Sequence, residues 1–287
     1  MSFKLADISM TDSLLRIWLS AFPEDSKEDI RLFFSKFLKP DYCAIWMENG
    51  APVSMTFMLP AELIVNGRAS LKLAYIYAAA TLTEYRGRGI FGRLLNEAHR
   101  YLKAKGTDAC FLHPADGGLY RYYSRFGYKN YFQVCTETFD SGSLQSCQPE
   151  GAPEETGRLN PETRNSLLSG YPVWVKWPEQ LILLAASGAE RMGGSVIEVK
   201  GGWAVCEPSD GGLYIPEWLC LPEYEDLLLK SVVSRFPDRS IVLRRPVHIN
   251  RDDRGEKFGM ICPLTPGADK LVRDTAGYSP YMGFTFD

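Results

Sequence analysis

The sequence contains no C-x-x-C pair, few histidines and no long hydrophobic run, and each shortage excludes a class of protein. Its seven cysteines are odd in number and scattered, which argues against a disulfide framework and a cysteine-rich zinc site. Its three histidines, His99, His113 and His248, lie far apart, so no metal site is expected. The uncharged apolar stretches, such as 73–83, are shorter than the roughly 20 residues that span a bilayer. We therefore expect no metal and no membrane association.

Charge and the first residues indicate the compartment and the kind of partner. The formal net charge is −3 and the pI about 5.8, whereas nucleic-acid-binding domains are usually basic. The first ten residues have no apolar core and no small-residue cleavage site of a secretory signal. We expect a soluble, cytoplasmic protein that does not bind nucleic acid. No pattern in the sequence indicates an oligomeric state.

Composition predicts a folded chain with two domains. The 287 residues are 45% hydrophobic and 13% aromatic, which supplies ample apolar surface for burial. Residues 141–164 are dominated by Ser, Gly, Pro and Glu and carry no hydrophobic period, as is typical of a linker. We therefore expect a domain over 1–140, a linker over 141–164 and a second domain over 165–287.

Hydrophobic periodicity predicts an α/β fold in both halves of the chain. The expected helices cover 11–21, 26–38, 90–105, 119–125 and 223–235. The expected strands cover 42–47, 52–65, 71–82, 109–112, 131–139, 195–199, 203–207, 213–221 and 241–244. Three strands, a helix and a strand follow one another around helix 90–105 and again around helix 223–235. This order predicts a diverged second copy of one architecture.

The segment most suited to binding a ligand covers residues 78–92, AAATLTEYRGRGIFG. They run from a strand through a turn rich in glycine and arginine into a helix. The first turn of a helix has unpaired N–H groups and the positive end of its dipole, so it can bind phosphate. Gly87 and Gly89 would let the backbone approach an anion closely, and Arg86 and Arg88 could add charge.

The turn allows two other interpretations. It could simply connect a strand to a helix. Alternatively, Gly87, Gly89 and Gly92 match the dinucleotide-binding pattern G-x-G-x-x-G. That pattern requires its first glycine at the strand end and an acidic residue closing the next strand. Here residues 83–86 intervene and Asp108 precedes the next strand, so dinucleotide binding is rejected.

Two motifs in the expected order make the first domain similar to a known family. The turn reads R-x-x-G-x-(G/A) up to its last position, and residues 122–128, YYSRFGY, follow one short strand after the helix. With both motifs, residues 1–140 resemble the GNAT superfamily of N-acetyltransferases. The resemblance implies a mixed sheet flanked by helices, with acetyl-CoA as cosubstrate. Phe91 departs from the Gly or Ala usual at the last motif position.

The resemblance also assigns roles to individual residues. The cosubstrate pyrophosphate would bind at the turn, a backbone N–H at the end of the preceding strand would polarise the thioester carbonyl, and Tyr123 would protonate the leaving thiolate. Tyr120 and Tyr122 are expected to pack. The implied cosubstrate-binding residues are Ala80, Thr81, Leu82, Arg86, Gly87, Arg88, Gly89, Ile90 and Phe91.

The residues that would bind the acceptor amine are less clearly indicated by the sequence than those that would bind acetyl-CoA. Glu24 and Asp25 could recognise a cationic amine between the first two helices, although acids in this position are more often solvated residues beside a helix cap. His113 could carry a proton or be structural. The alternation in 281–287 predicts a strand.

The two-domain plan partly resembles acetyltransferases of the enhanced-intracellular-survival type. That likeness implies that the terminal carboxylate of Asp287 approaches Tyr123. In the second half, residues 221–225 are acidic where a phosphate site would be positive, so we expect no CoA site there.

The sequence thus favours an N-acetyltransferase that moves an acetyl group from acetyl-CoA to a primary amine, by direct transfer in a ternary complex. The alternative is a non-catalytic protein that retains the fold and binds CoA or a protein partner. The sequence names neither the acceptor nor the general base.

Overall fold

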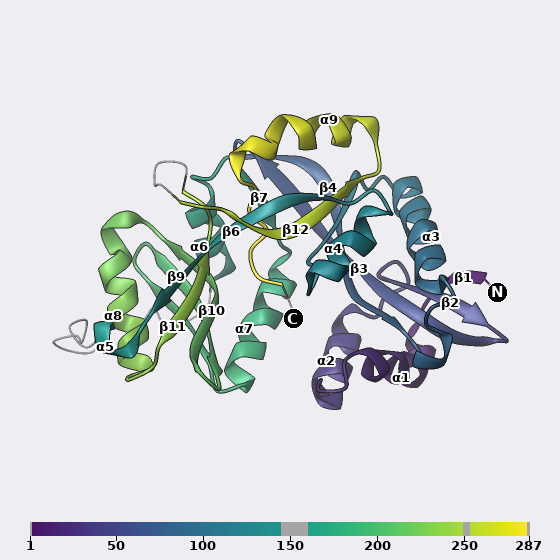
Figure 1. The fold of residues 1–287 in the computed structure, drawn as a ribbon, viewed down its shortest axis with the longest axis horizontal. Helices are drawn as coiled ribbons and strands as arrows, with labels where there is room; N and C mark the ends of the chain where they lie inside the picture. Colours follow the sequence, from purple (N-terminus) through teal and green to yellow (C-terminus); the bar gives the residue numbers. More distant parts are fainter. Residues whose placement is uncertain (1, 145–159, 249–252, 286–287) are drawn as a thin grey trace. The chain divides into compact units, whose positions relative to one another are not determined.

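The computed structural model describes residues 2–144, 160–248 and 253–285 and divides the chain into two compact units (Figure 1). Unit 1 comprises Met1–Ala61, Leu71–Lys129 and Met260–Arg273. Unit 2 comprises Glu62–Ser70, Asn130–Gly259 and Asp274–Asp287. Both units are mixed α/β structures, which confirms the expected fold class. No helix in the described part of the chain is both long and apolar enough to span a membrane.

Unit 1 is built on one mixed sheet with the strand order β1-β2-β3-β4-β5-β12. β4 and β5 are parallel, while β1–β2, β2–β3 and β5–β12 are antiparallel. The strands are β1 (Ser2–Leu5), β2 (Cys43–Glu48), β3 (Ala51–Val65), β4 (Arg68–Thr81), β5 (Ala109–Leu112) and β12 (Glu256–Pro263). The helices are η1 (Ile8–Met10), α1 (Thr11–Ala21), α2 (Lys27–Phe37), η2 (Thr83–Tyr85), α3 (Ile90–Ala104), α4 (Gly117–Ser124) and α9 (Pro266–Thr275).

An aromatic cluster joins α1 and α2 to the sheet of unit 1. The ring of Trp18 on α1 lies 5.5 Å from Phe33 and 5.6 Å from Phe34 on α2, and 6.0 Å from Phe57 on β3. All four side chains are buried. The expected apolar faces of the two helices therefore form the core on this side of the sheet. Ser26 caps α2, because its hydroxyl accepts from the N–H groups of Glu28 and Asp29.

Unit 2 repeats this plan with a second sheet, in the order β6-β11-β10-β9-β8. Its strands are β6 (Lys129–Phe139), β8 (Ser195–Val199), β9 (Gly202–Ser209), β10 (Gly212–Cys220) and β11 (Ile241–Arg245); β7 (Val173–Lys176) pairs with the end of β3. Its helices are α5 (Ser141–Leu144), α6 (Pro161–Leu168), α7 (Glu179–Arg191), η4 (Pro222–Tyr224), α8 (Glu225–Arg235) and η5 (Ala276–Tyr278).

The two units share a motif, and each completes it with a strand from the other half of the chain. In unit 1, α3 connects the parallel strands β4 and β5; in unit 2, α8 connects the parallel strands β10 and β11. β12 then pairs antiparallel with β5, and β6 pairs antiparallel with β11.

This exchange of final strands explains why the units differ from the domain ranges expected from the sequence. β6 lies in the first expected domain but belongs almost entirely to unit 2, and residues 260–273 return to unit 1. Hydrophobic patterns identify strands but not their pairing partners. Residues 145–159 of the expected linker lie outside the described residues.

A buried ion pair lies at the centre of unit 2. The Nε of Arg164 on α6 donates to Glu217 on β10 at 2.8 Å, and both side chains are inaccessible to solvent. The indole N–H of Trp203 donates to the same carboxylate at 3.2 Å. These contacts give both charges partners, because an unpaired charge in a protein interior is strongly destabilising.

The last described residues pass over this ion pair. The strand expected over 281–287 is wrong for residues 281–285, and residues 286–287 lie outside the described part of the chain. Only Tyr281 forms a bridge, with Trp174. Gly283 then adopts a left-handed backbone (φ 83°), where a Cβ would collide with Nη2 of Arg164. The indole N–H of Trp177 donates to the Met282 carbonyl at 2.6 Å. The alternating pattern therefore reflects burial of Met282 and Phe284 in an irregular segment.

We predict that Glu217→Ala lowers the free energy of unfolding by about 3–5 kcal/mol, because it leaves a buried arginine without a counter-charge. Urea denaturation followed by tryptophan fluorescence measures this change. Glu97→Ala is the matched control, because it removes an exposed pair with Arg100 worth less than about 1 kcal/mol. Equal stability of the two variants would contradict this role for the buried pair.

Candidate functional site

The turn between β4 and α3 has the backbone geometry that its glycines allow. Gly87 and Gly89 have φ angles of 74° and 67°, a left-handed region that other residues rarely adopt. Gly89 is the N-cap of α3, and no side chain caps the helix there. The N–H groups of the first helical turn, from Ile90 onward, therefore have no acceptor within the helix.

Both arginines of the turn hold its backbone in place. Arg86 donates from Nε to the Thr81 carbonyl at 2.9 Å and from Nη2 to the Ser20 carbonyl at 2.6 Å. Arg88 donates from Nη2 to the Glu84 carbonyl at 2.7 Å. Both side chains are exposed, so they also bring positive charge to the helix start. The structure thus adds a positioning role to the charge expected from the sequence.

Arg93 is a third cation at this helix start, and our sequence analysis missed it. Its Nη1 donates to the Arg88 carbonyl at 3.1 Å and lies 3.6 Å from the position of a Cβ on Gly89. The spacing between Gly89 and Arg93 could have indicated this residue, because a residue four positions after the N-cap lies on the same face of the helix.

The end of β4 departs from regular strand geometry. Ala78 has a left-handed backbone with φ 48°. On β3, the buried hydroxyls of Ser54 and Thr56 donate to the carbonyls of Ala80 (2.9 Å) and Tyr77 (3.1 Å). These carbonyls thus receive side-chain hydrogen bonds at this end of the strand. The only signal in the sequence was the pair of hydroxyl residues within an otherwise apolar strand.

The backbone N–H groups expected to face the acyl group are not equivalent. The Leu82 N–H donates to the Val53 carbonyl at 3.0 Å, so it is already engaged. Thr81 carries a hydroxyl that lies 2.8 Å from that of Ser54. Within the expected range 80–82, the Leu82 N–H is therefore the one whose acceptor within the protein is known.

Tyr123 lies on α4 and is surrounded by aromatic rings. Its side chain is 7% exposed, and its ring lies 5.4 Å from that of Tyr122 and 5.6 Å from that of Tyr128. Burial, with a smaller contribution from Tyr122, raises the pKa of Tyr123 well above its usual value near 10. The phenol therefore stays protonated at neutral pH and is able to donate a proton.

Phe91 brings the helix start and the tyrosine motif together. Its ring lies 6.4 Å from the rings of both Tyr122 and Tyr123. One residue later, a Cβ on Gly92 would lie 2.8 Å from the Phe126 ring, so α3 approaches the motif as closely as glycine allows. The bulky side chain at this motif position therefore packs against the tyrosines.

The remaining candidates are spread over unit 1. Asp25 is exposed but accepts a hydrogen bond from the indole N–H of Trp18 at 2.6 Å, which anchors the aromatic cluster. Glu24 beside it is exposed, and His113 is half-buried directly after β5. Asp287 lies outside the described residues. Within the described ranges, no three His, Cys, Asp or Glu side chains gather as a metal ion would require.

Known proteins support the family that the two motifs indicate. Residues 2–130 match the family model described as an acetyltransferase (GNAT) domain. A search of curated proteins finds no match.

Solved structures of similar fold include a GCN5-related N-acetyltransferase from Kribbella flavida, with a TM-score of 0.71 and 20% identity, over 96% of this chain and 74% of that one. A GCN5-related N-acetyltransferase from Anabaena variabilis has a TM-score of 0.70 and 15% identity, over 92% of this chain and 73% of that one. Eis1 from Mycobacterium abscessus has a TM-score of 0.65 and 13% identity, over 92% of this chain and 74% of that one.

The fold and the site thus define an acetyltransferase-type domain. Residues 2–130 form a domain of the GNAT superfamily, which confirms the resemblance predicted from the two motifs. The similarity to the solved structures extends over both units, but at these low identities it concerns the fold.

Proposed function

We propose that the protein is an N-acetyltransferase that transfers the acetyl group of acetyl-CoA directly to a primary amine. The observation that carries this proposal is the meeting of two functional elements through Phe91. The open helix start at Gly89 suits a pyrophosphate, and the buried Tyr123 suits a proton donor. A domain that only bound CoA would have no need for the second element.

Acetyl-CoA binding would use the backbone of the turn and the charges around it. N–H groups between Gly87 and Phe91 would donate to the pyrophosphate oxygens, aided by the dipole of α3. Arg88 and Arg93 would add positive charge, and Arg86 would mainly hold the turn. The pantetheine arm would follow the end of β4.

The proposed reaction forms a carbon–nitrogen bond and breaks the carbon–sulfur bond of the thioester. A neutral amine attacks the acetyl carbonyl, whose oxygen would accept a hydrogen bond from the N–H of Ala80 or Thr81. As the tetrahedral intermediate collapses, the carbon–sulfur bond breaks and the leaving thiolate takes the phenolic proton of Tyr123. The attacking nitrogen releases its extra proton to water, and water returns a proton to the phenolate. Burial raises the pKa of Tyr123, so the phenol is protonated at neutral pH and has a proton to give to the thiolate.

We propose Glu24 as the residue that attracts a cationic acceptor, because Asp25 is engaged with Trp18. We also propose that unit 2 binds no CoA. In unit 2, η4 has Pro222 and Glu223 where the corresponding turn of unit 1 has glycine and arginine. The terminal carboxylate of Asp287 is proposed to approach Tyr123. This part of the proposal rests on the resemblance to the enhanced-intracellular-survival type; within unit 2, Gly283 and Phe284 of the tail pack against Arg164.

A non-catalytic protein that binds CoA or a partner remains the competing function. Phe91 in place of the usual Gly or Ala favours the non-catalytic function, whereas the position of Tyr123 favours an acetyltransferase. The Tyr123 experiment below separates the two.

We predict that Gly89→Asp weakens acetyl-CoA binding at least ~10-fold, or about 1.4 kcal/mol, because a carboxylate at the helix start repels the pyrophosphate. Isothermal titration calorimetry measures the dissociation constant. Gly50→Asp is the matched control: its φ is also positive (80°), and it lies in the turn between β2 and β3. An absence of acetyl-CoA binding by the unaltered protein would overturn the proposed function.

We predict that Tyr123→Phe lowers kcat by roughly 10²–10⁴-fold while acetyl-CoA affinity is retained, because the proton donor is lost and the ring packing remains. Acetylation of a panel of primary amines, followed by thiol release, measures kcat. Tyr122→Phe, one residue earlier in the motif, should leave kcat unchanged. If the unaltered protein binds acetyl-CoA but acetylates no amine, the non-catalytic alternative is correct.

We predict that removal of Phe286 and Asp287 lowers kcat but leaves the melting temperature unchanged, because the truncation ends after the residues that pack on Arg164 and Glu217. The same thiol-release assay and a thermal melt measure both effects. Unchanged turnover in the folded, truncated protein would show that the terminal carboxylate takes no part.

A further inference from the structure

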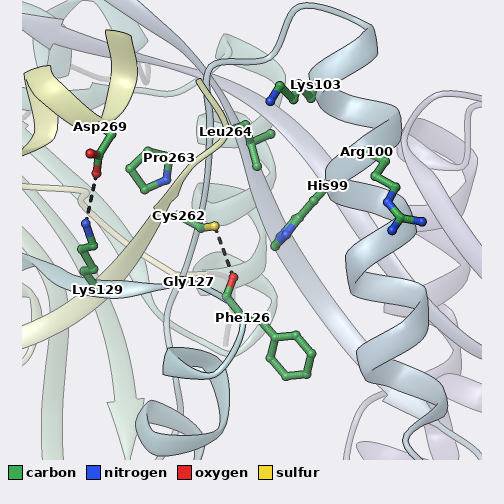
Figure 2. A pocket seen from close by; sticks show the side chains of 10 residues that line it. All are labelled: His99, Arg100, Lys103, Phe126, Gly127, Lys129, Cys262, Pro263, Leu264 and Asp269. Carbon is green, nitrogen blue, oxygen red and sulfur yellow. Dashed lines mark hydrogen bonds and ion pairs between the residues drawn. The ribbon is translucent and has the colours of Figure 1, made fainter. Parts of the chain in front are cut away.

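Unit 1 contains a cavity of about 480 Å³ that none of the proposed steps uses. Its walls come from four parts of the sequence: the second half of α3, the turn after α4, the beginning of β6, and the end of β12 with α9 (Figure 2). The returning segment Met260–Arg273 therefore supplies one wall of the cavity.

The rim of this cavity is predominantly cationic. Arg100 and Lys103 on α3 and Lys129 at the start of β6 line it, with Asp269 of α9 as the single lining carboxylate. Asp269 is already paired with Lys129 at 3.0 Å and also with Arg273 at 2.7 Å. Figure 2 shows the Lys129–Asp269 pair on the side opposite α3. Lys103 is exposed, and no carboxylate of the lining is within ion-pair distance of it in the described structure.

The floor of the cavity is apolar and neutral. Phe126, Pro263 and Leu264 contribute hydrophobic surface, and Cys262 lies beneath with its thiol donating to the Phe126 carbonyl at 3.4 Å. His99 also lines the cavity, and its Nε2 lies 2.9 Å from the Tyr128 hydroxyl. Burial lowers the pKa of His99 to about 4, so the imidazole is neutral at pH 7 and the positive charge comes from the rim.

This cavity is separate from the proposed pyrophosphate site. The pyrophosphate would bind at Ile90, the first residue of α3, whereas Lys103 lies near the last. Thirteen residues of α-helix correspond to roughly 20 Å along its axis. A single phosphate group cannot contact both ends of the helix.

We propose that this cavity is a second binding site, for a small organic phosphate that carries an apolar group. The phosphate would lie at the rim near Lys103, whose charge no lining carboxylate offsets, and beside Arg100, which is paired with Glu97 at 2.5 Å on the same helix. The apolar group would cover Phe126 and Leu264. Each half of such a ligand matches a surface that the cavity offers, and the pairing of Asp269 reduces its repulsion of an anion.

Phenyl phosphate is a suitable probe, with inorganic phosphate for the charge alone and benzyl alcohol for the apolar group alone. The ring protons of His99 report binding by NMR within the cavity itself, and a His99→Gln spectrum assigns them. With the full chain saturated by acetyl-CoA, phenyl phosphate should shift them saturably and bind at least ~10-fold more tightly than either half-probe.

Lys103→Glu should weaken phenyl phosphate binding at least ~10-fold, because it reverses a charge at the rim. Lys36→Glu is the matched control, an exposed charge reversal on α2 that should have no effect. Leu264→Ser tests the apolar floor independently, because it removes apolar surface without adding charge, and it should weaken binding as well.

Three results would overturn the proposal. They are the absence of a saturable shift, equal affinities of the Lys103→Glu and Lys36→Glu variants, and displacement of phenyl phosphate by acetyl-CoA. The last would show that the probe occupies the cosubstrate site. None of these measurements depends on turnover, so the cavity and the proposed acetyltransferase activity are tested separately.

Discussion

The candidate site depends on the hydrogen bonds by which Arg86 ties the end of β4 to the end of α1. One guanidinium holds the carbonyls of Thr81 and Ser20, and the Ser20 hydroxyl also accepts from the Thr83 N–H. Because α1 also carries Trp18, the start of α3 is fixed relative to the aromatic core. An anion-binding helix start is useful only if its N–H groups are held in place before the ligand arrives.

Local features of unit 1 could be predicted from the sequence. Residues 11–21 and 109–112 have the bounds that hydrophobic periodicity predicted, because an amphipathic helix and a short buried strand each carry their signal within a few residues. The turn and Tyr123 could also be found, since both motifs are contiguous. Their meeting through Phe91 could not, because contacts between segments about 30 residues apart leave no local pattern.

Features that depend on pairing between distant segments could not be predicted. The sequence does not predict β12 or α9, and its alternating pattern over 281–287 predicts a strand where residues 281–285 form an irregular tail. In each case the decisive partner, such as Cys110 for Cys262 or Arg164 for Gly283, lies more than 100 residues away. Burial alone produces an alternating apolar pattern, whether or not a neighbouring strand is present.

The pairing of β12 with β5 has a consequence for the synthesis of this protein on the ribosome. Cys110 and Cys262 face each other across the two strands although about 150 residues separate them. The ribosome adds about 5–20 residues per second, so one edge of β5 remains unpaired for roughly 8–30 s until β12 has been synthesised. A nascent chain in this state is open to strand pairing with other chains. The final strand thus sets the earliest moment at which the first unit is complete.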